Sequence, residues 1–174
     1  FLDRFAHPFF SEERKVDRKE VLDRLLFVVK EEDVSILLEK FKTISLPDLL
    51  LALGQRITPA TIQNTDGIPP LDATVLAACL APYNVQLSKA VRAFEKHEER
   101  STNSFWGKLT GNPLEKENKV KEILQAILQN KTWWNVYYHY KHELVYEVRM
   151  ATGHGVRCKL SPMEFIGLVE PFVV

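Results

Sequence analysis

Residues 144–160 read LVYEVRMATGHGVRCKL, two runs of alternating apolar and polar residues on either side of a short turn. β-branched and aromatic residues with a period of two are typical of strands. Ala151-Thr152-Gly153 fits a three-residue hairpin loop, in which the glycine adopts the left-handed conformation. The predicted register pairs Met150 with His154, Val148 with Val156, Glu147 with Arg157, and Tyr146 with Cys158.

The two faces of this predicted hairpin differ in chemistry. One face is apolar and includes Cys158, whereas the other carries Glu147, Arg149, Arg157 and Lys159. A slip by one residue sets Arg149 beside Arg157, which like-charge repulsion disfavours. We therefore expect the apolar face to pack on helices and the charged face to be exposed or to meet a partner.

The sequence before the hairpin is mostly helical. Apolar residues recur at helical spacing in about six segments, and the last of these is a short aromatic helix over residues 133–142. Residues 164–169 add a third strand after a Ser-Pro turn. The predicted fold class is α+β, with about six helices in a bundle-like arrangement and a small C-terminal three-stranded antiparallel meander.

Composition divides the chain into three parts. Residues 1–54 form an N-terminal helical segment, and residues 55–70 contain Pro, Gly, Asn and Asp in the pattern of a loop or linker. Residues 71–174 contain further helices and the meander. A length of 174 residues also suits one domain overall, and the sequence leaves this alternative open.

The overall composition excludes several classes of protein. The chain has 23 basic and 23 acidic residues and no net charge, which argues against a polyelectrolyte-like nucleic-acid binder. No apolar run approaches the roughly 20 residues that span a bilayer. Two distant cysteines, Cys79 and Cys158, do not form a disulfide scaffold. We expect a soluble intracellular protein, cytoplasmic or nuclear, without a membrane partner.

A metal site is one candidate for chemistry. His139, His142, His154 and Cys158 are residue types that suit zinc. In an extended strand, however, His154 and Cys158 lie roughly 13 Å apart, which is too far for them to share one ion. The sequence contains no Cys-x-x-Cys or His-Glu-x-x-His spacing and no glycine-rich phosphate loop. We therefore predict no metal and no cofactor.

An acid–base site on the charged face of the hairpin is a second candidate. Glu147, Arg149, His154 and Arg157 supply a base, an acid and phosphate-neutralising cations, which suits phosphodiester cleavage. The competing interpretation is an ordinary cross-strand ion pair between Glu147 and Arg157 on an exposed sheet.

The aromatic segment also has several interpretations. Trp133, Trp134, Tyr137 and Tyr138 fit a buried helix, a protein interface or a surface on which nucleic-acid bases stack. Residues 131–160 carry five basic and two acidic side chains, so this part of the chain is locally basic.

Our leading interpretation is a non-enzymatic protein-interaction or assembly module, a scaffold within a longer chain. It binds a protein partner or the remainder of its own chain, and nucleic acid is a less favoured partner. The alternative is an RNA- or nucleotide-binding or phosphodiester-cleaving domain that uses the Glu147, Arg149, His154 and Arg157 face. The predicted partner-binding residues are Trp133, Trp134, Tyr137, Tyr138, Arg149, His154 and Arg157.

Overall fold

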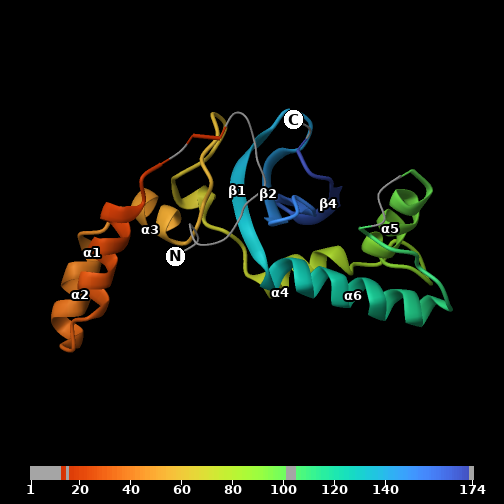
Figure 1. The fold of residues 1–174 in the computed structure, drawn as a ribbon, viewed down its shortest axis with the longest axis horizontal. Helices are drawn as coiled ribbons and strands as arrows, with labels where there is room; N and C mark the ends of the chain where they lie inside the picture. The colour runs from red at the N-terminus through yellow and green to blue at the C-terminus, as the bar shows by residue number, and fades with distance from the viewer. Residues whose placement is uncertain (1–12, 15, 101–104, 173–174) are drawn as a thin grey trace.

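The helices come first in the chain and an antiparallel sheet follows (Figure 1). The computed structural model describes residues 13–14, 16–100 and 105–172. In this part of the chain six α-helices precede a four-stranded sheet, which confirms the predicted α+β class. The elements are α1 (Lys19–Val29), α2 (Val34–Lys42), α3 (Leu46–Ala52), the 3₁₀-helix η2 (Thr65–Gly67), α4 (Asp72–Cys79), α5 (Lys89–Arg100), α6 (Pro113–Gln129), β1 (Lys131–His139), β2 (Glu143–Met150), β3 (Gly155–Leu160) and β4 (Met163–Val169).

The sheet is a meander in the order β1-β2-β3-β4, so each strand pairs with the next one in the chain. Gly153 in the β2–β3 turn has a φ of 86°, in the left-handed region that glycine adopts without strain. A Cβ atom at this position would also lie 2.8 Å from the Cα atom of Pro171. The predicted register is confirmed: β2 and β3 pair Tyr146 with Cys158, Glu147 with Arg157, and Val148 with Val156.

The aromatic segment predicted as a helix over residues 133–142 is strand β1 instead, so that prediction was wrong. β1 pairs with β2 from Trp133 opposite Arg149 to His139 opposite Glu143. Trp, Tyr, Val and Thr favour the extended chain, and pairing with β2 outweighs the helix-like spacing of the aromatic residues. The sheet therefore has four strands rather than three.

The helices α4, α5 and α6 pack on the apolar face of the sheet, as expected. A capping box starts α6: the Asn112 side chain accepts from the Glu115 N–H at 3.1 Å, and Glu115 Oε2 accepts from the Asn112 N–H at 2.8 Å. The main buried side chains of this core are Leu50, Val75, Cys79, Val91, Phe94, Val120, Leu124, Ile127, Trp134, Val136, Tyr146, Val148, Val156 and Cys158.

Residues 55–70, predicted as a loop or linker, lie against the outer edge of the sheet. Gln55 forms a bridge with Trp134, and the Ile62 N–H donates to the Val136 carbonyl oxygen at 2.9 Å. The division of the chain into three parts remains a prediction. The helices α1 and α2 extend from this end of the molecule, away from α5 (Figure 1). No helix among the described residues has the length and apolar character that crossing a membrane requires.

Candidate active site

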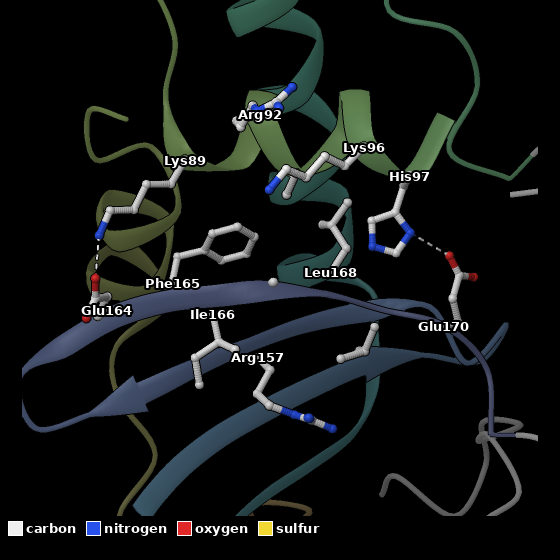
Figure 2. A pocket seen from close by; sticks show the side chains of 13 residues that line it. Lys89, Arg92, Lys96, His97, Arg157, Glu164, Phe165, Ile166, Leu168 and Glu170 are labelled. Carbon is white, nitrogen blue, oxygen red and sulfur yellow. Dashed lines mark hydrogen bonds and ion pairs between the residues drawn. The ribbon is translucent and has the colours of Figure 1, made fainter. Parts of the chain in front are cut away.

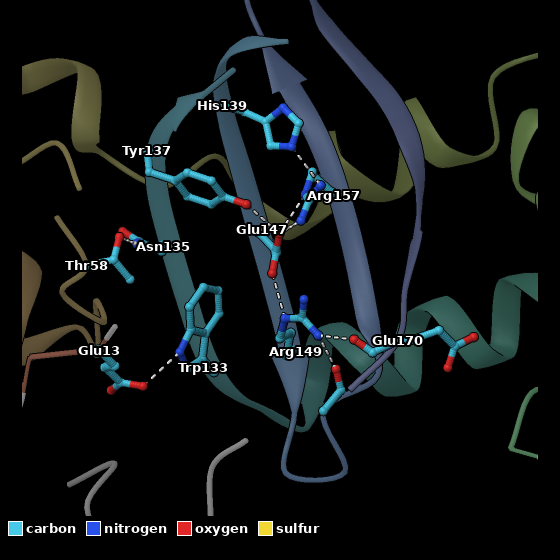
Figure 3. Close-up of polar contacts among 11 residues, drawn as sticks. Glu13, Thr58, Trp133, Asn135, Tyr137, His139, Glu147, Arg149, Arg157 and Glu170 are labelled. Atoms are coloured by element: carbon cyan, nitrogen blue, oxygen red, sulfur yellow. Dashed lines mark hydrogen bonds and ion pairs between the residues drawn. The ribbon is translucent and has the colours of Figure 1, made fainter. Parts of the chain in front are cut away.

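The face of the sheet that points away from α4, α5 and α6 is polar (Figure 3). Side chains alternate along each strand, so every second residue of β1 lies beside the polar residues of β2 and β3. The side chains that share this face are Trp133, Asn135, Tyr137 and His139 from β1, Glu147 and Arg149 from β2, and Arg157 from β3.

Glu147 lies at the centre of this face and is only 1% exposed. Its Oε2 atom accepts hydrogen bonds from the Tyr137 hydroxyl at 2.7 Å and from Arg157 Nε at 2.6 Å. Its Oε1 atom accepts from Arg149 Nε at 2.6 Å. Burial alone raises the pKa of Glu147, but the charges of Arg149 and Arg157 outweigh it, so the pKa lies below its ordinary value. The carboxylate is therefore charged and holds both guanidinium groups in place.

Arg149 is buried and connects three parts of the chain. Its Nη1 atom donates to the carbonyl oxygens of Gly153 in the turn and of Glu170 after β4. The Phe172 ring covers the guanidinium group, with its centroid 3.8 Å from Cζ. With 3% of its surface exposed, Arg149 has little contact with solvent, and its contacts indicate a role in positioning Glu147 and the chain after β4.

Arg157 and His139 meet at the open part of the same face. Arg157 Nη1 lies 3.1 Å from His139 Nε2, and the Arg157 side chain is 23% exposed. An arginine only donates hydrogen bonds, so this contact is a hydrogen bond in the tautomer whose Nε2 atom carries no proton. Burial and the positive charge of Arg157 together lower the pKa of His139 below its ordinary value.

The other nitrogen of His139 also faces a donor. The Lys141 N–H lies 3.2 Å from His139 Nδ1. A neutral imidazole accepts at one nitrogen only, so these two contacts exclude each other and belong to different tautomers. Protonation of both nitrogens would abolish both hydrogen bonds. The surroundings therefore favour a neutral, basic imidazole near pH 7.

Tyr137 fixes the other side of the cluster. Burial and the negative charge of Glu147 raise the pKa of its hydroxyl above the ordinary value. The hydroxyl therefore stays protonated and donates to Glu147. Tyr137 acts as a neutral hydrogen-bond donor rather than as a base.

A cavity of about 820 Å³ opens over this cluster. Its volume falls in the usual range for small-molecule sites, roughly 300–1,000 Å³. Exposed aromatic rings beside charged groups suit the stacking of nucleobases while a phosphate meets the cations. The lining comes from all four strands, residues 58–60 and the chain after β4, and its aromatic members are Trp133, Tyr137, Tyr138, Tyr140 and Phe172.

The structure brings together three of the four residues of the predicted acid–base set. Glu147, Arg149 and Arg157 share the polar face, but the predicted exposure of this face was wrong for Glu147 and Arg149. Residues 58–60 and the chain after β4 border this face, and the two side chains point into the cluster instead of into solvent.

His154 does not join the other three. It lies opposite Met150 at the end of the hairpin, on the side of the sheet that carries the helices. Its ring stacks on Phe105 with centroids 3.5 Å apart and meets the Trp106 ring edge-on at 5.3 Å. Its Nε2 atom lies 3.2 Å from Glu170 Oε2. The Phe105-Trp106 pair, not the charged cluster, therefore surrounds His154.

The four predicted aromatic residues divide between the two faces of β1. Trp133 and Tyr137 line the cavity, and so does the more exposed Tyr138. Trp134 is buried in the core, where its Nε1 atom donates to the Leu53 carbonyl oxygen at 3.0 Å. The predicted role of Trp134 in partner binding therefore has no support from its position.

The sequence interpretation missed His139 as a member of the charged cluster, and it missed the part of the cavity lining that comes from residues 58–60 and from the chain after β4. It treated His139 only as a metal ligand on a helix. In a helix, side chains do not alternate between two faces, so this interpretation did not place His139 beside Glu147. Reading residues 131–139 as a strand places positions 133, 135, 137 and 139 on one face, beside Glu147. That alternation was the available signal, whereas the contribution of Phe172 depends on how the chain returns after β4.

The histidines and cysteine considered for zinc are not gathered in one place. The rings of His139 and His142 stack with centroids 5.0 Å apart, but Cys158 is buried in the core on the other face of the sheet. In the part of the chain that the structure describes, no three His, Cys, Asp or Glu side chains are grouped so that they could hold a metal ion.

A buried carboxylate that holds two arginines, beside a neutral imidazole in an open cavity, is chemistry that suits a phosphodiester substrate. The model of the family described as the CdiA C-terminal tRNase toxin domain matches residues 77–170. This match covers more than half of the chain, and the chain belongs to that family. No curated protein and no solved structure matches the chain significantly.

Family membership corrects our leading interpretation. A tRNase toxin domain is an enzyme that cleaves tRNA, so a non-enzymatic interaction or scaffold module was wrong, as was the preference for a protein partner over nucleic acid. The family agrees with the alternative, a phosphodiester-cleaving domain. The whole-chain charge was misleading because it averages over the locally basic residues 131–160.

Proposed function

We propose that this chain cleaves phosphodiester bonds in tRNA at the polar face of its C-terminal sheet, in the cytoplasm where tRNA is found. The observation that carries this proposal is the 3.1 Å approach of Arg157 Nη1 to His139 Nε2 in an open cavity. A partly exposed cation stands there beside an unprotonated imidazole. These are the groups needed to bind a phosphate and to remove a proton from a neighbouring hydroxyl.

The proposed reaction begins when a substrate phosphate binds Arg157. A phosphate oxygen replaces His139 Nε2 as the acceptor of the Arg157 Nη1 hydrogen bond, which frees the Nε2 lone pair. His139 then takes the proton of the ribose 2′-hydroxyl, and the 2′ oxygen attacks phosphorus. The bond from phosphorus to the 5′ oxygen breaks, and this oxygen takes a proton from solvent. The products are a 2′,3′-cyclic phosphate and a 5′-hydroxyl, and His139 returns its proton to solvent.

Glu147 and Arg149 act as positioning residues in this scheme. Both oxygens of Glu147 accept hydrogen bonds within the chain, from Tyr137, Arg149 and Arg157, so the carboxylate is engaged in holding the cluster. It fixes the guanidinium of Arg157 through Nε and leaves Nη1 directed at the cavity. Preorganised charge of this kind stabilises the charge that develops on the phosphate in the transition state.

The test is cleavage of purified tRNA by the chain and by two histidine variants. Because a general base contributes about 10²–10⁴-fold, His139→Ala should lower the single-turnover rate at least about 100-fold. His142→Ala is the matched control, since His142 neighbours His139 but does not line the cavity. Equal rates for His139→Ala and the unmodified chain would contradict the assignment of the base.

A further inference from the structure

A second cavity, of about 810 Å³, lies between helix α5 and the edge strand β4 (Figure 2). It adjoins the proposed active site because Arg157 lines both cavities, together with Leu168, Val169 and Glu170. In Figure 2 the α5 side chains lie on one side of β4, whereas Arg157 lies on the other side and its guanidinium points away from α5. A substrate bound at Arg157 reaches α5 by passing the edge of β4, at the residues that line both cavities.

The α5 side of this cavity is cationic. Lys89, Arg92 and Lys96 recur at intervals of three and four residues, so they lie on one face of the helix. With Arg157 they give the cavity four cations, against the two carboxylates of Glu164 and Glu170. The lining thus attracts an anion.

The cations differ in how far they are neutralised within the chain. Lys89 Nζ lies 2.6 Å from Glu164 Oε1 and is firmly paired. Arg92 has a longer contact, 3.8 Å from its Nη1 atom to Glu95 Oε2. Lys96 is exposed and has no ion pair or hydrogen bond with any residue that the structure describes. Arg92 and Lys96 are therefore the cations best able to exchange for an external phosphate.

The β4 strand leaves room for a close approach of a chain. Among the described residues it is the last strand in the sheet order and pairs with β3, so its other side is an edge of the sheet. Gly167 lies opposite Arg157, and a Cβ atom built there has nothing within 4 Å. A ribose-phosphate chain can thus pass Gly167 on its way from Arg157 to α5.

We propose that the α5–β4 groove, defined by Lys89, Arg92, Lys96 and Gly167, binds the sugar-phosphate backbone of tRNA outside the cleaved bond. This inference rests on the proposed function, because it extends the substrate from Arg157. A free sheet edge also suits a peptide that adds a strand. The excess of cations and the continuity with Arg157 favour RNA, since pairing with a peptide strand needs neither.

The test compares tRNA binding in a His139→Ala background, in which cleavage is slowed at least about 100-fold. Arg92→Gln with Lys96→Gln should weaken binding roughly tenfold at moderate salt and lower the slope of log K against log salt by about 1.5, because two phosphate contacts are lost. Lys30→Gln with Lys42→Gln removes the same charge from the C-terminal ends of α1 and α2, at the opposite end of the molecule. This control should leave the affinity and the salt slope unchanged within error.

The two proposals fail in different ways. Absence of tRNA cleavage by the unmodified chain contradicts the proposed function itself. Cleavage by the unmodified chain, with the same affinity and salt slope in the α5 variant as in the control, contradicts only the groove. Lys96→Gln alone tests the groove with a variant that should fold, since Lys96 is exposed. It should lower the salt slope by about half as much as the double variant.

Discussion

Replacing Glu147 by Gln keeps the shape of the side chain and removes the charge that holds Arg149 and Arg157. The carboxylate accepts three hydrogen bonds of 2.6–2.7 Å, two of them from guanidinium groups. The amide of Gln offers one acceptor oxygen and points its own N–H groups at donors. Breaking a buried ion pair from one side costs about 3–5 kcal/mol, because the remaining charge is left uncompensated.

We therefore expect Glu147→Gln to lower the free energy of unfolding by about 4 kcal/mol and Tm by about 10 °C. Urea unfolding followed by tryptophan fluorescence measures this difference. The matched control is Glu122→Gln, which removes a carboxylate 3.9 Å from Lys119 with 71% of its side chain exposed. That exposed pair should contribute less than about 1 kcal/mol.

The pH dependence of this difference provides a further check. Because the pKa of Glu147 is lowered in the folded chain, its stabilisation is present above the ordinary value of 4.5 and is lost as pH falls through the folded value. The Gln variant has no such group. The difference in the free energy of unfolding between the two proteins should be largest at pH 7 and smaller in acid. If the free energy of unfolding of Glu147→Gln at pH 7 lies within about 1 kcal/mol of that of the unmodified chain, the Glu147 carboxylate does not stabilise the fold through Arg149 and Arg157.

Three further predictions concern activity. In a plot of the tRNA cleavage rate against pH, the loss of activity in acid should occur below pH 6.5, because burial and Arg157 lower the pKa of the proposed base His139. A loss of activity that occurs above pH 6.5 would argue for another base. Arg157→Gln removes a positive charge that lowers the pKa of His139, so the loss of the remaining activity in acid should move to higher pH. Gly167→Val should reduce tRNA cleavage by at least tenfold, by filling the open space beside Arg157, with a Tm change of a few degrees at most; unimpaired cleavage would show that RNA does not pass there.

The hairpin was predictable because its determinants are local. The alternation of β2 and β3 and the glycine at position 153 specify one register, and the structure has that register. The burial of Glu147 was not predictable from the same residues. It depends on Tyr137 from β1 and on the return of the chain after β4, which are contacts between distant parts of the sequence.

The aromatic segment shows how one wrong element hides a site. Trp133, Tyr137 and Tyr140 have spacings that suit a helix. The segment is a strand because it pairs with β2, and the sequence of the segment alone does not show this pairing. Pairing with β2 turns Tyr137 and His139 toward Glu147. The proposed base was therefore assigned to the wrong geometry, although its neighbours Arg149 and Arg157 were identified.

The central claim is that His139 and Arg157 promote attack by the ribose 2′-hydroxyl on the adjacent phosphate. The most direct measurement is the chemical identity of the ends of the tRNA fragments that the unmodified chain produces. Attack by the 2′ oxygen should leave a 2′,3′-cyclic phosphate on the upstream fragment and a 5′-hydroxyl on the downstream fragment. A 3′-hydroxyl with a 5′-phosphate would contradict it, because those ends arise when water, not the 2′ oxygen, attacks phosphorus.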